Sequence, residues 1–190
     1  MLPRSPRKKL SIFATPATLE QYSFLIRLFI EEFFHKEPTV ELDTIARQIL
    51  GLLQRDGRLS NVALSEQVGL SESPCFRRVK RLEESGVIQG YAAVLDQHLL
   101  GLTVTAFVQV SLERQPDTTA EFIRRVVDEE HIVECHATSG AHDYLMKVVA
   151  RDVAHFSELC MERILRFPGV RHVESSFSLK AMKDSRMLPA

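Results

Sequence analysis

The sequence predicts an α+β fold in two parts, a helical N-terminal domain and a C-terminal domain in which strands and helices alternate. Two observations support this prediction. Apolar residues recur every three or four positions between Leu42 and Gly86, as on one helix face, and alternate with polar residues in segments 102–112 and 172–180, as in half-buried strands. The predicted parts, after an extension at 1–41, are a helical domain at 42–90, a linker at 91–101, a mixed domain at 102–182 and a C-terminal tail at 183–190.

The composition is typical of a folded protein outside the membrane. The chain has 190 residues, 45% hydrophobic and 26% charged, with a formal net charge of -1. No apolar run approaches the ~20 residues that cross a bilayer. The cysteines Cys75, Cys135 and Cys160 are widely spaced and form no CxxC pair. This spacing argues against a disulfide framework and fits a reducing cytosol, so we expect a cytoplasmic protein.

The first two helices of the N-terminal domain have recognisable ends. The first stops at Asp56-Gly57, and its apolar face is Leu42, Ile45, Ile49 and Leu52. Ser60 can cap a second, short helix over residues 61–68. Gly69 ends it, because glycine adopts the left-handed backbone of a helix C-terminus without strain.

The third helix separates apolar from basic residues. Ser71 or Ser73 caps it, Pro74 fits its first turn, and Gly86 ends it. At 100° per residue its core-facing sector contains Cys75, Val79 and Leu82. The opposite side contains Arg77, Arg78 and Arg81.

This arrangement predicts a helix-turn-helix that binds DNA. A run of charges is more often a solvated helix face, which is the alternative explanation. The glycine turn, the capped start and the one-sided basic face together favour a recognition helix, whose first turns reach base edges and phosphates. The candidate DNA-binding residues are Asn61, Ser73, Pro74, Arg77, Arg78, Lys80 and Arg81.

The C-terminal domain is expected to be ferredoxin-like, with the order β-α-β-β-α-β. A short β-segment beginning at Val87, the wing of the helix-turn-helix, is expected to lead to it. The expected strands are 102–112, 132–138, 144–150 and 172–180. One helix opens at the capping box formed by residues 118–121, and the other follows Asp152.

The same patterns assign side chains to the core of this domain. The first helix is expected to turn inward Phe122, Ile123, Val126 and Val127, and the second Phe156, Leu159, Cys160 and Ile164. The helices cover one face of the sheet. We expect the other face to carry Phe107, Tyr144 and Met146 and to be covered by a second copy of the chain.

The chain from Leu42 to Leu188 resembles the Lrp/AsnC family of transcriptional regulators. The similarity rests on LDTIARQILGLLQRDGR, LSNVALSEQVGLSESPCFRRVKRLEESGVIQGY, ECHATSGAHDYLMKV and LRFPGV taken together. The resemblance implies DNA binding by the helix-turn-helix, a C-terminal ligand-sensing domain, dimers that assemble further to octamers, amino-acid effectors and a place at the bacterial nucleoid. One departure is Ala46, where the family usually has an aspartate.

The resemblance also places an effector site at the Gly-x-x-Asp-Tyr turn, which here is Gly140, Asp143 and Tyr144. An amino acid suits this chemistry, because Gly140 lets backbone N–H groups approach a carboxylate and Asp143 can accept from an ammonium. The alternative is that Asp143 only forms a tight turn between two strands, as aspartate often does.

Other classes of function have weaker support. His131, Cys135, His136 and His142 are close in sequence, but Cys135 and His136 would point to opposite faces of one strand, so we expect no metal site. No nucleophile motif, phosphate loop or carboxylate pair indicates an enzyme, and no cofactor is expected. The predicted function is a sequence-specific DNA-binding transcriptional regulator whose assembly and DNA affinity respond to a small effector. The alternative is an architectural DNA-binding protein without an effector.

The extension at 1–41 has two explanations. Its run YSFLIRLFIEEFF can form an amphipathic helix that packs on the DNA-binding domain or a partner subunit, with Arg4, Arg7, Lys8 and Lys9 as a basic arm. Alternatively, translation begins near Val40, which a GTG start codon can encode. We favour the later start, because the composition of this run matches nothing that the fold requires.

Overall fold

The computed structural model describes residues 41–113 and 116–189. These residues form two compact units. One consists of the described residues up to Ala93 together with those from Ser185 onward, and the other of Val94–Asp184. The expectations for the N-terminal extension fall almost wholly outside the described residues. No helix in the described part of the chain combines the length and hydropathy that a membrane span requires.

The helical unit contains the expected three helices, α2 (Thr44–Arg55), α3 (Asn61–Val68) and α4 (Glu72–Glu84). Ser60 caps α3 by accepting from the backbone N–H of Ala63, and Gly69 ends it with a φ of 69°. Ser71 precedes α4 but makes no side-chain cap. Their shared core consists of Ala46, Ile49, Leu50, Leu64, Val68, Cys75 and Leu82. The predicted positions of Ile49, Cys75 and Leu82 are confirmed, whereas Leu42, Ile45 and Leu52 are only partly buried at the edge of this core.

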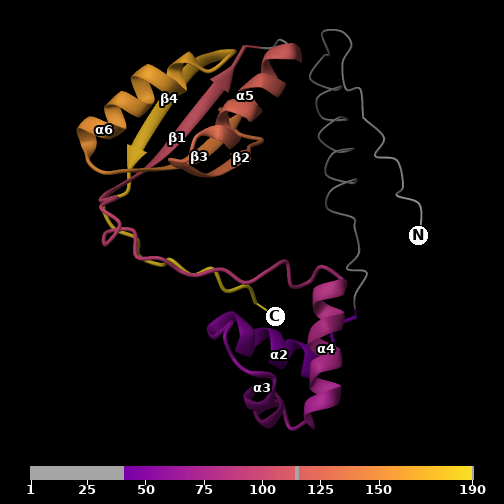
Figure 1. The fold of residues 1–190 in the computed structure, drawn as a ribbon. Helices are drawn as coiled ribbons and strands as arrows, with labels where there is room; N and C mark the ends of the chain where they lie inside the picture. Colours follow the sequence, from indigo (N-terminus) through magenta and orange to yellow (C-terminus); the bar gives the residue numbers. More distant parts are fainter. Residues whose placement is uncertain (1–40, 114–115, 190) are drawn as a thin grey trace. The chain divides into compact units, whose positions relative to one another are not determined.

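The second unit is a four-stranded antiparallel sheet covered by helices. Its elements are β1 (Val104–Leu112), α5 (Pro116–Asp128), β2 (Ile132–Ala137), β3 (Tyr144–Ala150), α6 (Val153–Glu158) and β4 (Val170–Phe177). The strand order β2-β3-β1-β4 is the ferredoxin-like arrangement that the sequence predicts. Figure 1 shows α5 and α6 lying over the sheet.

The core of this unit lies between the helices and one face of β1. Ala106, Val108 and Val110 are fully buried, so the alternation predicted for this strand is confirmed. Phe122 from α5 and Phe156 and Leu159 from the second helical segment complete the core. That segment continues beyond α6 as a π-helical turn (Leu159–Arg163) and a 3-10 turn (Ile164–Arg166).

The expected composition of the open sheet face is wrong for two residues. Met146 lies opposite Val108 and Tyr144 opposite Val110, so both side chains share the helix-covered face. Met146 is fully buried, and the Tyr144 ring centroid lies 4.9 Å from that of Phe122. The sequence YLMKVVA is apolar on both faces, so its alternation could not show which face the helices cover.

Three further expectations need correction. Helix α5 begins at Pro116, before the predicted capping box. The side chains of Ile123 and Val127 are 46% and 77% exposed rather than turned inward, since only Phe122 and Val126 of that apolar group face the sheet. Residues 87–101 contain no strand, and the segment from Asp96 forms a turn in which Gln97 donates to the Thr105 hydroxyl, 3.0 Å away.

Phe122 and Ile123 provide a matched test of this core. We expect Phe122→Ala to lower the free energy of unfolding by about 3–5 kcal/mol, because it removes a fully buried ring. Ile123→Ala, one position along and half-exposed, is expected to cost under about 1 kcal/mol. Urea unfolding followed by circular dichroism measures both. Equal losses would contradict the orientation of α5.

Candidate DNA-binding and effector sites

Helix α4 presents its basic residues on the side opposite the core. Cys75 and Leu82 are buried, whereas the side chains of Arg77, Lys80 and Arg81 are exposed. Lys80 pairs with Glu84 one turn later, at 3.7 Å. Such an exposed pair is weak, so Lys80 remains available to a phosphate. The helix therefore carries a cationic surface of the kind that DNA binds.

A groove of about 340 Å³ separates the exposed face of α4 from the start of α2. Acidic, basic and apolar residues line it, namely Glu41, Asp43, Ala46, Pro74, Arg77, Arg78, Arg81 and Leu82. Arg77 and Arg81 border the groove without an ion pair among the described residues, whereas Arg78 is held by Asp43. The basic residues of α4 therefore do not all play the same part.

Asp43 has two hydrogen-bonding roles. Its Oδ1 accepts from the backbone N–H of Ala46 at 2.7 Å, which caps α2, and its Oδ2 lies 2.6 Å from Nη1 of Arg78. The Ala46 N–H and then the Arg78 guanidinium hold the pKa of the Asp43 carboxyl below its usual value. One carboxylate thus starts α2 and attaches α4 to it. An aspartate directly before Thr44 is a cap signal that the sequence shows. The pairing of this aspartate with Arg78, 35 positions away, gives no such signal.

Asn61 also bonds within the unit. Its Nδ2 donates to the carbonyl of Glu72 at 2.9 Å, which joins the start of α3 to the start of α4. Its Oδ1 is buried and has no hydrogen-bond partner in the described part of the chain. Ser73 is exposed and Pro74 is half-buried beside the groove. The DNA contacts of all seven candidates stay predictions, with Arg77, Lys80 and Arg81 the most accessible of the basic ones.

The predicted effector turn is attached to the end of β1. Asp143 Oδ2 accepts from the backbone N–H of Leu112 at 2.8 Å, and the Asp143 N–H donates to the carbonyl of Val110 at 3.0 Å. The other carboxylate oxygen has no hydrogen-bond partner among the described residues. Asp143 therefore makes the turn and still has an acceptor to offer a ligand.

The other two effector candidates differ in access. Gly140 is exposed, and a Cβ there would meet no atom within 4 Å, so the backbone is open to a ligand. Tyr144 faces the core, and burial raises the pKa of its phenol. The structure therefore places Gly140 and Asp143 on the accessible turn and the Tyr144 ring beneath it. Their role in effector binding stays a prediction.

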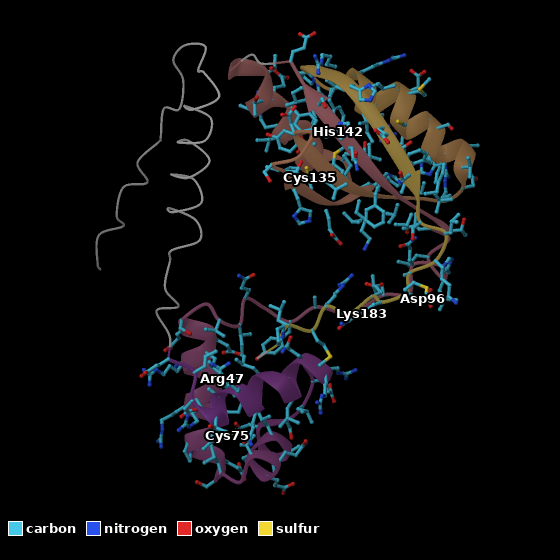
Figure 2. All side chains as sticks on the ribbon, turned by 180° about the vertical axis from the view of Figure 1, so that it is seen from behind. Arg47, Cys75, Asp96, Cys135, His142 and Lys183 are labelled. Atoms are coloured by element: carbon cyan, nitrogen blue, oxygen red, sulfur yellow. The ribbon has the colours of Figure 1, made fainter. Side chains whose placement is uncertain are left out.

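His142 borders the same turn on the open face of the sheet, where Figure 2 labels it. Its Nδ1 lies 3.1 Å from the Ser111 hydroxyl and its Nε2 lies 3.5 Å from a carboxylate oxygen of Glu174. The ring stacks on His172, with centroids 5.9 Å apart. Residue spacing gave no sign of this group, because β1 and β4 supply three of its four members.

The cysteine and histidines considered as metal ligands have other partners or positions. Cys135 faces the same side of the sheet as its neighbour Met146, and its thiol pKa is raised by burial. His136 lies 3.6 Å from Glu134. The described residues contain no group of three or more side chains suited to hold a metal ion.

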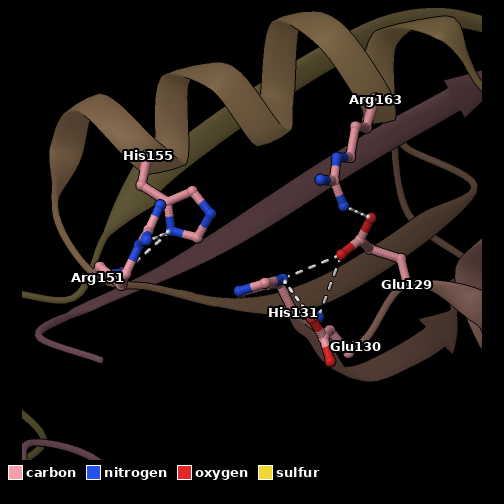
Figure 3. A network of polar contacts seen from close by, with 6 residues as sticks. All are labelled: Glu129, Glu130, His131, Arg151, His155 and Arg163. Atoms are coloured by element: carbon pink, nitrogen blue, oxygen red, sulfur yellow. Dashed lines mark hydrogen bonds and ion pairs between the residues drawn. The ribbon is translucent and has the colours of Figure 1, made fainter. Parts of the chain in front are cut away.

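His131 belongs to a polar network at the end of α5 (Figure 3). Glu129 accepts from Arg163 at 2.9 Å and lies 3.1 Å from Nδ1 of His131. Burial raises the pKa of Glu129, but the hydrogen bonds from Arg163 and His131 outweigh it, and the pKa is lowered overall. The His155 ring packs edge-on against that of His131, with centroids 4.8 Å apart. This network ties α5 to the second helical segment.

The sequence matches two family profiles. Residues 42–89 match a winged helix-turn-helix DNA-binding domain, and residues 105–188 match the Lrp/AsnC ligand binding domain. The leucine-responsive regulatory proteins of Escherichia coli K12 and Salmonella typhimurium are each 44% identical to the chain over 154 residues, which is 80% of this chain and 94% of the relative.

Solved structures agree in fold. A transcriptional regulator from Neisseria meningitidis in complex with L-methionine has a TM-score of 0.77 and 39% identity, and the match covers 78% of this chain and 97% of that one. The feast or famine regulatory protein of M. tuberculosis complexed with L-methionine has a TM-score of 0.72 and 29% identity, covering 79% of this chain and 100% of that one.

The lowered pKa of Asp43 predicts a pH-dependent contribution to stability. A carboxyl with a depressed folded pKa stabilises above its unfolded pKa of about 3.9, and the contribution disappears as the pH falls through the folded value. We expect Asp43→Asn, which keeps a capping oxygen, to be less stable than wild type near neutral pH, with a difference that narrows as the pH falls below about 3.9. Urea titrations across this range measure the difference. Glu84→Gln is the control, and a pH-independent gap would contradict the role of the Asp43 charge.

The exposed basic face predicts a salt-dependent DNA phenotype. Arg77→Ala and Arg81→Ala should each weaken binding to a duplex selected from a random pool. Each lost phosphate contact should also reduce the slope of log K against log salt by about 0.9. Fluorescence anisotropy over a salt series measures this. Arg124→Ala removes an exposed charge from α5 and should leave the slope unchanged. An unchanged slope in folded Arg77 and Arg81 variants would show that this face is only solvated.

Proposed function

The chain belongs to the Lrp/AsnC family of DNA-binding transcriptional regulators, and we propose that its effector is an L-amino acid bound at the turn before β3. The observation that carries this proposal is the state of Asp143, whose carboxylate uses one oxygen to hold the turn and leaves the other unbonded among the described residues. Two structural relatives that are complexes with L-methionine support the choice of ligand class.

The ligand's two charged groups match the two accessible positions of the turn. The free oxygen of Asp143 would accept from the ammonium group, and the open backbone at Gly140 would approach the carboxylate. The side chain of the amino acid would then decide which amino acids bind. Because Asp143 also accepts from Leu112, a ligand there acts directly on the end of β1.

The regulatory step would be a change in assembly and DNA affinity. A dimer presents two recognition helices to half-sites about 34 Å apart, so any change in subunit arrangement alters the fit to DNA. A typical coupling between two such sites is about 1–3 kcal/mol. In this proposal no cofactor takes part and the chain performs no catalysis. Burial raises the pKa of the Cys75 thiol, and a protonated thiol is a poor nucleophile. Cytoplasmic location stays a prediction.

Two substitutions at Asp143 separate ligand binding from turn formation. Asp143→Asn keeps a neutral oxygen for the Leu112 N–H but removes the negative charge, so it should preserve stability and weaken L-methionine or L-leucine binding by about 10-fold or more. Asp143→Ala removes both functions and should also lower the melting temperature. Isothermal titration with each amino acid measures binding, and anisotropy with the selected duplex measures the response.

If Asp143→Asn binds L-methionine and L-leucine with the affinity of the wild-type protein, the effector binds elsewhere and Asp143 is only a turn residue. If none of the twenty common amino acids binds the wild-type protein or changes its DNA affinity, the result supports the alternative of an architectural DNA-binding protein without an effector.

A further inference from the structure

The C-terminal tail is bonded to helix α2 in both directions. The backbone N–H of Leu188 donates to Oε1 of Gln54 at 2.6 Å, and Nε2 of Gln54 donates to the Leu188 carbonyl at 3.0 Å. These two residues are separated by 134 positions in the chain. Figure 1 shows the C-terminal end of the chain beside α2. The Gln54 side-chain amide thus hydrogen-bonds to both the N–H and the carbonyl of one residue, as the backbone of a neighbouring strand does.

The tail therefore belongs to a different unit from the strand that precedes it. Strand β4 lies in the unit Val94–Asp184, whereas the residues from Ser185 onward belong to the helical unit. The chain passes between the units once at Ala93 and again at Asp184. The eight Cα–Cα steps from Phe177 to Ser185 can span at most about 26–29 Å. The tail is thus a second covalent tether of limited length.

The tether ends on the helix that supports the recognition helix. Asp43, at the start of α2, holds Arg78 of α4, and Gln54 lies near the end of the same helix. Restricting α2 consequently restricts α4, which is packed on it through Cys75 and Leu82.

We propose that residues 185–189 form a strap that docks on Gln54 and pre-orients the helix-turn-helix for DNA. A flexible connection between two domains must be ordered when a dimer binds two half-sites, and an existing tether reduces that cost. The strap acts whether or not an effector binds, so it extends the DNA-binding function and does not depend on the amino-acid proposal.

We expect the docked strap to be in equilibrium with a free one. Both bonds join neutral groups near the surface, and the Leu188 side chain is 74% exposed. Each such bond shifts an equilibrium by about 2- to 10-fold. DNA affinity can gain no more from the strap than the docking equilibrium provides. Loss of one bond should therefore weaken DNA binding by about 2- to 10-fold, without loss of folding.

Backbone chemistry supplies matched variants. Leu188→Pro removes the N–H that Gln54 accepts, whereas Leu188→Ala keeps both backbone groups. Gln54→Ala removes the partner amide, and Gln48→Ala removes an exposed glutamine from the same helix. All four should have the circular dichroism and melting temperature of the wild-type core.

Docking is measured first, by trypsin cleavage of the full-length protein after Arg186, followed by mass spectrometry. A docked strap hinders cleavage two residues before Leu188, so Gln54→Ala should be cut about 2- to 10-fold faster than wild type, and Gln48→Ala and Leu188→Ala at the wild-type rate. Leu188→Pro is left out of this comparison, because a proline so close to the cleaved bond itself impairs trypsin. Equal rates in these four proteins would overturn the docking.

DNA affinity for the selected duplex is measured next, without amino acids. Weaker binding by Leu188→Pro and Gln54→Ala, but not by their controls, supports the strap. Faster cleavage with unchanged DNA affinity would overturn its role in DNA binding. A protein that fails to respond to any amino acid would contradict the effector proposal alone, because no step of this experiment uses an effector.

Discussion

Strand β1 is hydrogen-bonded on both edges, to β3 and to β4, and the C-terminal unit is organised around it. Its alternation sends Ala106, Val108 and Val110 under the helices, and the antiparallel register then assigns a face to every partner residue. Met146 and Tyr144 are drawn into the core by this register. The opposite face keeps polar groups, including the Lys147–Glu134 ion pair at 3.2 Å. One strand thus fixes which surface is core and which is left for contacts.

Both ends of the same strand carry functional attachments. At one end, Asp143 joins the proposed effector turn to Leu112 and Val110. At the other end, Gln97 joins Thr105 to the turn that follows the linker from the helical unit. A central strand bonded on both edges is stiff, because its movement would break ladders on two sides. If an effector binds at this turn as proposed, it acts on a strand whose other end is bonded to the turn that contains Gln97.

In the helical unit, different side chains of α4 pack in the core, face the solvent and attach the helix to α2. Cys75 and Leu82 bury its inner side, Arg77 and Arg81 remain on its outer side, and Arg78 at the boundary is held by Asp43. A guanidinium bound to a carboxylate is held in direction, so Arg78 attaches α4 to the start of α2.

Local sequence alone determined the ends of α3 and the alternation of β1, because caps, glycine turns and apolar periodicity act between residues close in the chain. Ser60, Gly69 and the alternation of β1 were sufficient for that. Only the tertiary structure decided that Ile123 is exposed, that Tyr144 is in the core, that Arg78 pairs with Asp43 and that Gln54 holds Leu188. A pattern shows that an element has two faces, but which face is covered, and by what, depends on segments far away in the sequence. Long-range polar pairs leave no periodic trace at all, since each partner is an ordinary exposed residue until the chain is folded.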